Sequence, residues 1–147
     1  MGAYAIYNNL NIDIYGKLYN WYAVNDSRGL CPTGWHIPSD RDWTTLTNYL
    51  SGESVAGGKM KSSGTTYWTY PNTAATNESG FSALPGGFRN IGGRFNSIRD
   101  DAWFWSVTEY DKYDAWARHL SNGSGDVGRR GFNFDKSVGA SVRCISN

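Results

Sequence analysis

The sequence has almost no net charge and lacks any long hydrophobic run. Its formal net charge is +1 over 147 residues, so nothing indicates a nucleic acid or an anionic membrane surface as partner. No stretch approaches the roughly 20 apolar residues that a membrane-spanning helix needs. No basic segment followed by an apolar run marks a signal peptide. We therefore expect no nucleic-acid partner and no direct insertion into a membrane.

Cysteine and histidine are also scarce, which argues against a metal site of the usual kind. Cys31 and Cys144 lie near opposite ends of the chain, and His36 and His119 are its only histidines. Metal sites favour closely spaced pairs of such ligands. A bridge between the cysteines would close a loop of more than a hundred residues, worth roughly 4–5 kcal/mol in the chain-entropy model. Two buried free thiols are the alternative; we expect the disulfide and an extracellular location.

Aromatic residues and glycine are abundant instead. The chain has seven Trp, ten Tyr and six Phe, which make up 16% of its residues, and it has 18 Gly. Such a composition builds a core from large rings and many turns, and it leaves amphipathic rings for surface contacts.

Periodicity predicts a single α+β domain over residues 1–147. Ser39 opens a helix with Asp42 as a capping box, its apolar residues recur at helical spacing (Trp43, Leu46, Tyr49, Leu50), and Gly52 ends it. A second, short helical turn is expected in 55–64, and a long polar loop follows over 65–93. Strands are expected at 15–24, 35–37, 102–107, 115–120, 127–132 and 137–145.

The stretch "DAWARHLS" at 114–121 alternates with a period of two. Trp116, Arg118 and Leu120 therefore share one face of a strand, and Ala117 and His119 share the other. The alternation alone does not say which of the two faces packs inward, and arginine is mostly exposed in folded domains.

Several longer motifs carry a resemblance to a known family. They are "YGKLYNWYAV", "GLCPTGWHIPSDRDWTTL", "TNESGFSALPGGFRN", "FWSVTEY", "AWARHL" and "GASVRC", and they run from about Tyr15 to Cys144. In these motifs the chain resembles the Fibrobacter succinogenes major paralogous domain of bacterial surface proteins. The resemblance implies a C-type lectin-like fold of the formylglycine-generating-enzyme branch, with a twisted antiparallel sheet, few helices, long loops and adjacent termini.

The resemblance also implies a variable binding face near the C-terminus. Members of this fold are frequent targets of diversity-generating retroelements, which vary chosen codons and leave the scaffold intact. Residues between 101 and 140 look like such a cassette, although Val107 and Ala140 depart from the residues expected there. The scaffold positions of this pattern imply that the Arg118 face packs inward, with Glu109 as the partner of the buried guanidinium, and that the His119 face meets a ligand. Arg129 is then expected inward or lateral and Arg130 outward, while the opposite assignment, with Arg118 exposed, stays open. The positions where family members differ, and where we expect ligand contacts, are Asp101, Trp103, Tyr113, Ala117, His119, Ser121, Asn122, Asp126, Gly128, Arg130, Phe132, Phe134, Val138 and Ala140.

Catalytic and metal-dependent alternatives have little support in the residues. The two cysteines match the family's structural pair, so none is left for the oxidase chemistry of the related branch. No Gly-x-Ser-x-Gly elbow is present. "VNDSRG" and "TNESG" offer oxygen ligands for calcium, but turns tied by backbone hydrogen bonds account for them equally well. We expect no enzyme activity, no cofactor and no metal, and we expect His36 to be a satisfied internal histidine.

The sequence thus predicts a non-enzymatic recognition module displayed on a bacterial surface or a phage tail tip. Its ligand would be a cell-surface glycan, stacked on Trp103 or Phe134, or a protein. His119 would hydrogen-bond the ligand or lie solvated on its strand. Two further hypotheses are a structural cell-wall domain whose aromatics are all internal, and an enzyme derived from the oxidase branch. The oligomeric state is left open.

Overall fold

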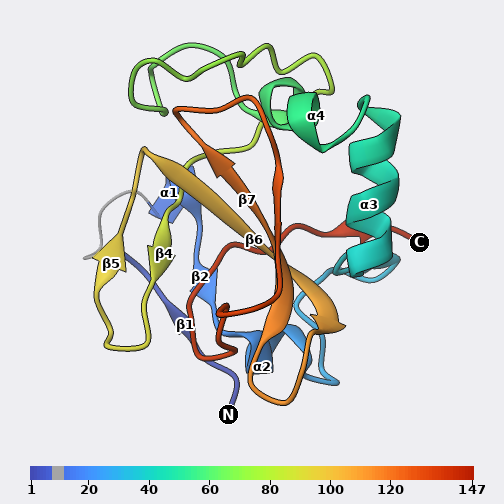
Figure 1. The fold of residues 1–147 in the computed structure, drawn as a ribbon. Coiled ribbons are helices and arrows are strands. Elements are labelled where there is room, and N and C mark those ends of the chain that lie inside the picture. The colour runs from blue at the N-terminus through green and yellow to red at the C-terminus, as the bar shows by residue number, and fades with distance from the viewer. Residues whose placement is uncertain (8–11) are drawn as a thin grey trace.

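The computed structural model describes residues 1–7 and 12–147, and it is a mixed α+β structure (Figure 1). All of its ladders between named strands are antiparallel. The helices are α1 (Ile12–Tyr15), α2 (Trp21–Val24), α3 (Asp40–Tyr49) and α4 (Glu53–Met60). The strands are β1 (Tyr4–Ala5), β2 (Leu18–Tyr19), β3 (Trp35–His36), β4 (Phe88–Arg89), β5 (Phe95–Asn96), β6 (Asp101–Glu109), β7 (Ala115–Ser121), β8 (Gly128–Arg130) and β9 (Ile145–Ser146).

A three-stranded sheet of β6, β7 and β8 crosses the middle of the molecule (Figure 1). Three two-stranded ladders, β1–β2, β3–β9 and β4–β5, surround it. Because β3 pairs with β9, the last strand of the chain lies beside the segment that leads into α3. The expected α+β class with antiparallel pairing is confirmed.

Two of the predicted strands were wrong. Residues 15–24 form only the two-residue β2 before the chain turns into α2, because the Asn20 side chain accepts a hydrogen bond from the Ala23 N–H and caps the helix. Residues 137–144 form isolated bridges rather than a strand, and only β9 follows them. The strands expected at 102–107 and 115–120 are present as β6 and β7.

The predicted start of the long helix is confirmed. The Ser39 side chain accepts a hydrogen bond from the Asp42 N–H, and the Asp42 carboxylate accepts one from the Ser39 N–H at 2.8 Å. Trp43 and Leu50 are buried as the helical spacing predicts, whereas Tyr49 is 86% exposed. The predicted second helix is also present as α4.

Helix α4 packs so closely against its neighbours that two of its positions must be glycine. A Cβ on Gly57 would lie 1.8 Å from the Asp126 carbonyl oxygen, and one on Gly58 would lie 2.3 Å from that of Ala74. Next to them the buried Lys61 ammonium donates to three backbone carbonyls, those of Thr73, Ser121 and Ser124. These contacts fix the long 65–80 loop, which has little regular structure of its own, against the end of β7.

Both faces of the β6–β7 pair are largely covered. Phe104 and Leu120 pack on one side into a cluster with Trp43 from α3, and Trp105 and Ala117 pack on the other side with Trp21 from α2. The indole N–H groups of Trp21 and Trp43 donate to backbone carbonyls of β6. The central sheet therefore has a core on each side, and an exposed binding surface is left only where one of these layers stops.

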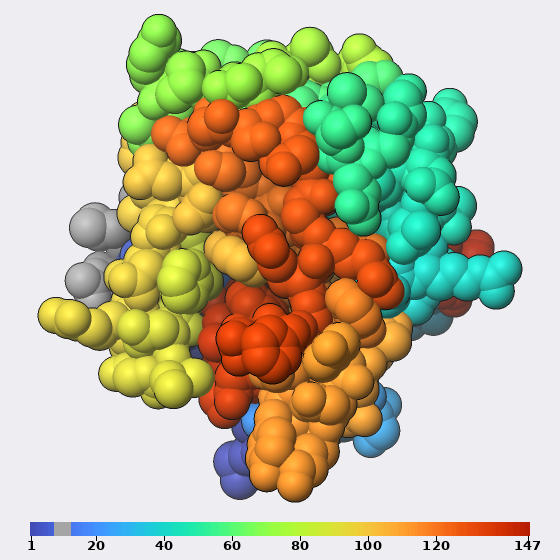
Figure 2. Space-filling model, viewed as in Figure 1, coloured from blue at the N-terminus to red at the C-terminus, as the bar shows by residue number. Residues whose placement is uncertain are grey.

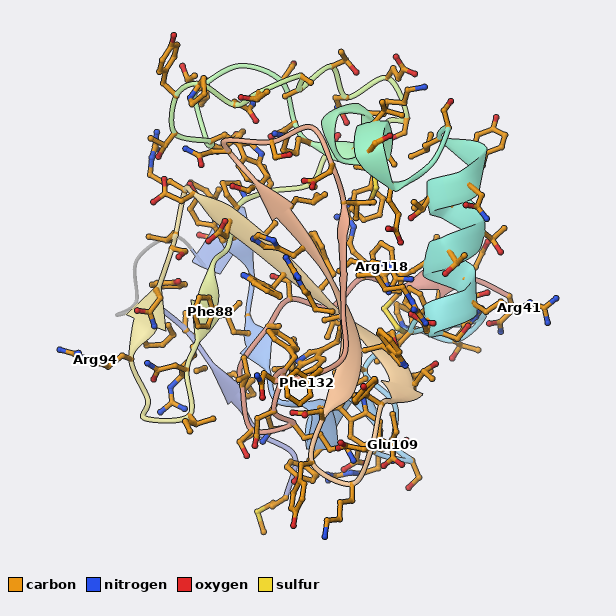
Figure 3. All side chains as sticks on the ribbon, viewed as in Figure 1. Arg41, Phe88, Arg94, Glu109, Arg118 and Phe132 are labelled. Atoms are coloured by element: carbon orange, nitrogen blue, oxygen red, sulfur yellow. A yellow bond between two sulfur atoms is a disulfide. The ribbon has the colours of Figure 1, made fainter. Side chains whose placement is uncertain are left out.

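Arg118 points inward as predicted, but its expected partner was wrong. The side chain is 2% exposed, and its guanidinium donates to the Asp40 carboxylate at 2.8 Å and to the Thr44 hydroxyl at 3.1 Å. Arg129 from β8 binds the same carboxylate at 2.7 Å. Arg118 lies opposite Phe104 in the strand register, whereas Glu109 lies opposite Ala115 at the end of β6, so the two side chains are at different places along the strand pair. Glu109 instead pairs with Lys136 at 3.0 Å (Figure 3).

The expected bridge between Cys31 and Cys144 is present. It joins the segment before β3 to the segment before β9, and it indicates an oxidising compartment outside the cytoplasm. Among the helices of residues 1–7 and 12–147, none is both long and apolar enough to cross a membrane.

Replacing Asp40 by Asn tests the ionic joint between α3 and the sheet. Removing one partner leaves the buried Arg118 charge uncompensated, so we expect the free energy of unfolding to fall by about 3 kcal/mol. Asp100→Asn, at an exposed carboxylate, is the matched control and should change it by less than about 0.5 kcal/mol. Urea denaturation followed by circular dichroism measures both, and equal stabilities would contradict the role given to Asp40.

The same salt bridges of Asp40 make the stability of the fold depend on pH. Burial raises the pKa of Asp40, but the hydrogen bonds from Arg129 and Arg118 outweigh it and hold the pKa below its ordinary value. A carboxyl whose pKa is lower in the folded state stabilises the fold above the unfolded pKa of about 3.9 and loses this contribution as the pH falls further. Denaturation curves between pH 7 and pH 2 should therefore show a smaller acid-side loss of stability for Asp40→Asn than for the parent.

Candidate functional site

The candidate site, which we call the recognition face, is the face of the β6–β7–β8 sheet that carries His119 and Arg130, together with Tyr113 in the β6–β7 turn and Phe132 just after β8. The register aligns Trp103 with His119 and Gly128 across the three strands, and Ala117 with Arg130 in the next row. Cross-strand neighbours in an antiparallel sheet lie on the same face, so these side chains form one surface. In Figure 2 the orange and red segments of the C-terminal third cover the middle of the viewed side.

An aromatic stack lies at the centre of the recognition face. The Trp103 indole is stacked between His119, whose ring centroid is 4.2 Å away, and Phe134, at 4.6 Å. Phe88 from β4 meets the same indole edge-on at 6.1 Å. Because both faces of the Trp103 ring are covered, a sugar cannot stack on it without displacing a neighbour. The expected glycan platform at Trp103 or Phe134 is therefore not presented in this structure.

The Trp103 indole N–H is buried without a hydrogen-bond partner among the described residues. In contrast, the indole N–H groups of Trp21, Trp43 and Trp105 all donate to backbone carbonyls. An unsatisfied buried donor costs about 1–3 kcal/mol, and such groups in native proteins call for an explanation. Trp103 is thus held by stacking rather than by a hydrogen bond.

His119 is oriented by a carboxylate on the neighbouring strand. Its Nε2 atom lies 3.0 Å from the Asp101 carboxylate, and both side chains are about one-fifth exposed. Burial raises the pKa of Asp101, but hydrogen bonds from His119, Ser97 and Ser121 outweigh it and lower the pKa below its ordinary value. The imidazole is therefore packed and hydrogen-bonded within the protein, with an edge open to solvent.

Gly128 leaves space between two polar side chains of the recognition face. A Cβ at this position would lie 3.5 Å from Arg130 Nε and 3.5 Å from His119 Cβ. A side chain there would contact both of its neighbours. Arg130 itself is exposed, and the salt bridges of the described residues do not include it.

The predicted contact residues divide into three groups by exposure. Ala117, Phe134, Val138 and Ala140 are buried, which corrects the expectation that they face a ligand: they fill the core on the α2 side of the sheet. Asp101, Trp103, His119, Ser121, Asn122 and Gly128 are partly buried. Tyr113, Asp126, Arg130 and Phe132 are exposed.

Phe132 and Phe134 point in different directions, although a strand would place them on the same face. Asn133, between them, has a φ of 58° and forms a turn in place of extended backbone. As a result Phe134 is 6% exposed and stacks on Trp103, whereas Phe132 is 70% exposed. Figure 3 shows Phe132 in front of the lower part of the sheet, well away from α3.

The other residues singled out in the sequence have structural roles. His36 is exposed rather than internal, and its Nδ1 lies 2.7 Å from the Asn147 side-chain oxygen. Asp26 binds Arg28, and the Asn77 and Ser82 side chains hydrogen-bond within their loop. In residues 1–7 and 12–147 no three His, Cys, Asp or Glu side chains gather in a group that would hold a metal ion.

Two contacts of the central sheet, one on the recognition face and one on the opposite face, were not anticipated from the sequence. Phe88 packs against Trp103 from β4, and Asp40 holds Arg118 and Arg129 from α3. The motif around Phe88, "GGFRN", was visible, but nothing in it indicated a contact with β6. Asp40 follows Ser39 directly, and its position at the start of the helix suggests only a favourable interaction with the helix dipole.

A comparison with family models places the whole fold in a known group. The model described as the Fibrobacter succinogenes major domain matches residues 3–146. The chain belongs to this family. No curated protein and no solved structure is detectably similar to the chain. Membership of the Fibrobacter succinogenes major domain family confirms the resemblance stated from the sequence motifs.

The two phenylalanines of "GFNF" give a direct test of the site geometry. Phe134→Ala removes a ring from the stack and from the core, so we expect it to lower the free energy of unfolding by about 3 kcal/mol. Phe132→Ala removes an exposed ring and should change it by less than about 0.5 kcal/mol. Thermal and urea denaturation of the two variants measure the difference; equal losses would contradict the opposite placement of the rings.

Proposed function

We propose that this protein is a non-enzymatic recognition module that binds a protein on a cell surface through its recognition face. The single observation that carries the proposal is the contrast between Phe132 and its surroundings. Its ring is 70% exposed just after β8, two residues from Arg130, whereas the aromatic rings of β6 and β7 are buried or partly buried. Phe132 and Arg130 are both exposed, so the fold loses little packing when they are removed.

The chemistry of this surface suits a protein ligand better than a glycan. Aromatic and arginine side chains dominate the energetics of protein–protein contacts. Tyr113, which is 61% exposed, adds a second amphipathic ring at the nearby β6–β7 turn. The Trp103 indole is covered on both faces, so a sugar would have to stack on the exposed Phe132 or Tyr113 rings instead. We therefore favour a protein, and a glycan is an alternative outcome of the experiment below.

The finer identification of the fold supports the same role. We infer a C-type lectin-like fold, because the family resemblance implies it and because a disulfide-linked α+β domain with paired terminal segments is consistent with it. The resemblance implies that the positions that differ between relatives include Tyr113, Asp126, Arg130 and Phe132, which are exposed in this structure. The disulfide is in keeping with display on a bacterial surface or a phage particle.

Binding to an array of bacterial surface proteins and glycans tests the proposal. The parent is compared with an Arg130→Ala/Phe132→Ala variant, and an Ile91→Ala/Arg94→Ala variant is the matched control, since Ile91 and Arg94 are exposed on the β4–β5 turn. We expect the parent to bind a protein, the first variant to lose at least about tenfold in affinity, and the control to bind like the parent.

Other results would change the conclusion in defined ways. Equal binding by the parent and the Arg130/Phe132 variant would contradict the recognition face. Binding of a glycan alone would replace the protein with a carbohydrate ligand. An absence of binding by a folded parent would favour the structural cell-wall hypothesis.

A further inference from the structure

A second surface, separate from the recognition face, lies between α3 and the end of the chain. It is a groove of about 1000 Å³, bounded by α3 on one side and by residues 143–146 on the other. In Figure 1 the C-terminal segment passes behind α3 to reach this position. Its volume matches the upper end of the range for ligand pockets.

The walls of the groove are mainly apolar. Trp35 is 50% exposed and Tyr49 is 86% exposed, and both line it together with Leu46 and Phe81. Single exposed hydrophobic residues are common on protein surfaces, but several in one concave region are typical of a binding site. The spacing of Tyr49 on α3 predicts a buried ring, but the ring is exposed and lines this groove.

One cation in the groove lacks the partner that the other buried cations have. Arg118 and Lys136 each pair with a carboxylate, and Lys61 binds three carbonyls. The Arg143 guanidinium donates to the Phe81 carbonyl and lies 4.4 Å from the Phe81 ring centroid. No carboxylate of the described residues lies within 4.0 Å of it.

The unused N–H groups of Arg143 are accessible from the groove. A guanidinium has several N–H donors in a planar fork, and one hydrogen bond to Phe81 leaves the others free. Arg143 lines the groove and is only partly buried, which leaves its remaining N–H groups for a ligand there. Arg143 is partly buried, and this burial lowers the pKa of its guanidinium.

We propose that this groove binds a peptide segment in which one carboxylate side chain is flanked by aromatic or branched aliphatic side chains. The carboxylate accepts two parallel hydrogen bonds from Arg143, and the apolar side chains pack on Trp35, Leu46 and Tyr49. Paired Arg–carboxylate hydrogen bonds are among the strongest, and partial desolvation strengthens them. The groove is open along its length, so a ligand with several side chains covers more of it than a single ring does.

The position of Asp42 adds selectivity to this groove. Its carboxylate lines the groove but is already occupied, because it accepts hydrogen bonds from the Ser39 N–H and hydroxyl. It therefore repels a second acidic side chain of the ligand. We expect a single carboxylate to bind better than a run of acidic residues.

Matched peptides test this proposal. We would titrate the ¹⁵N-labelled protein with acetylated, amidated tripeptides that have Glu between two residues drawn from Phe, Trp, Leu and Ile, and with the same peptides carrying Gln. We expect at least one Glu peptide to shift the amide signals of Leu46, Tyr49 and Ile145, with at least tenfold weaker binding of its Gln counterpart. Failure of every Glu peptide at millimolar concentration, or equal binding of Glu and Gln, would overturn the proposal.

Variants separate the ionic from the apolar part of the site. Arg143→Gln should reduce the affinity at least tenfold, whereas Arg41→Gln, at an exposed arginine of the same helix as Leu46 and Tyr49, should leave it unchanged (Figure 3). Tyr49→Ala cannot affect the core, since the ring is exposed, and it should weaken binding several-fold. Equal affinity of the Arg143 and Tyr49 variants and the parent would overturn the proposal.

Two controls separate this peptide site from a small-acid site and from the recognition face. Indole-3-propionate, a small aromatic acid, should bind much more weakly than the best peptide; equal affinity would identify the groove as a small-acid site and overturn the peptide assignment. The Arg130→Ala/Phe132→Ala variant should bind the peptides like the parent, because its changes lie on the recognition face. A loss of array binding by this variant would therefore leave its binding of the groove peptides unchanged.

Discussion

The Asp40 carboxylate is the contact on which the arrangement of this protein depends. It receives one arginine from β7 and one from β8, and it stands at the first residue of α3. An unpaired Arg118 at 2% exposure would be very costly, so β7 and α3 cannot separate without a large loss of stability. Lys61 and Lys136 act in the same way elsewhere, because each buried ammonium gathers backbone carbonyls from segments with little regular structure. Buried cations thus replace long strands as the means of fixing the loops.

This construction explains where an exposed surface remains. Both faces of the β6–β7 pair are packed against a core. The two faces therefore differ less in exposure than the alternating sequence suggests. Exposure is concentrated at the end of β8 and in the turns, where Phe132, Arg130 and Tyr113 lie. Residues of the same stretch that face the stack, such as Phe134 and Ala117, belong to the core. The proposed ligand contacts therefore need few of the positions that stabilise the fold.

Local chemistry made several elements predictable. The capping box at Ser39, the alternation in β6 and β7 and the disulfide follow from short patterns or from the cysteine count, whereas the inward Arg118 was implied by the family resemblance. The errors arose where a contact between distant residues, or a single backbone angle, determines the local conformation or the pairing of a side chain. Asn20 caps a helix inside an apparent strand, Asn133 turns the chain between two phenylalanines, and the strand register places Arg118 opposite Phe104 and Glu109 opposite Ala115. Neither Asp40 as the shared carboxylate nor Arg143 in its groove could be found without the distances between elements.

The most direct test of this account measures the stability of a protein with the exposed part of the recognition face removed. In a Tyr113→Ala/Arg130→Ala/Phe132→Ala variant, we expect the free energy of unfolding in urea to stay within about 1 kcal/mol of the parent, since exposed positions carry little of the fold. That result is required if these residues serve recognition. A loss of about 3 kcal/mol or more would show that they hold the fold together, and it would contradict the central claim.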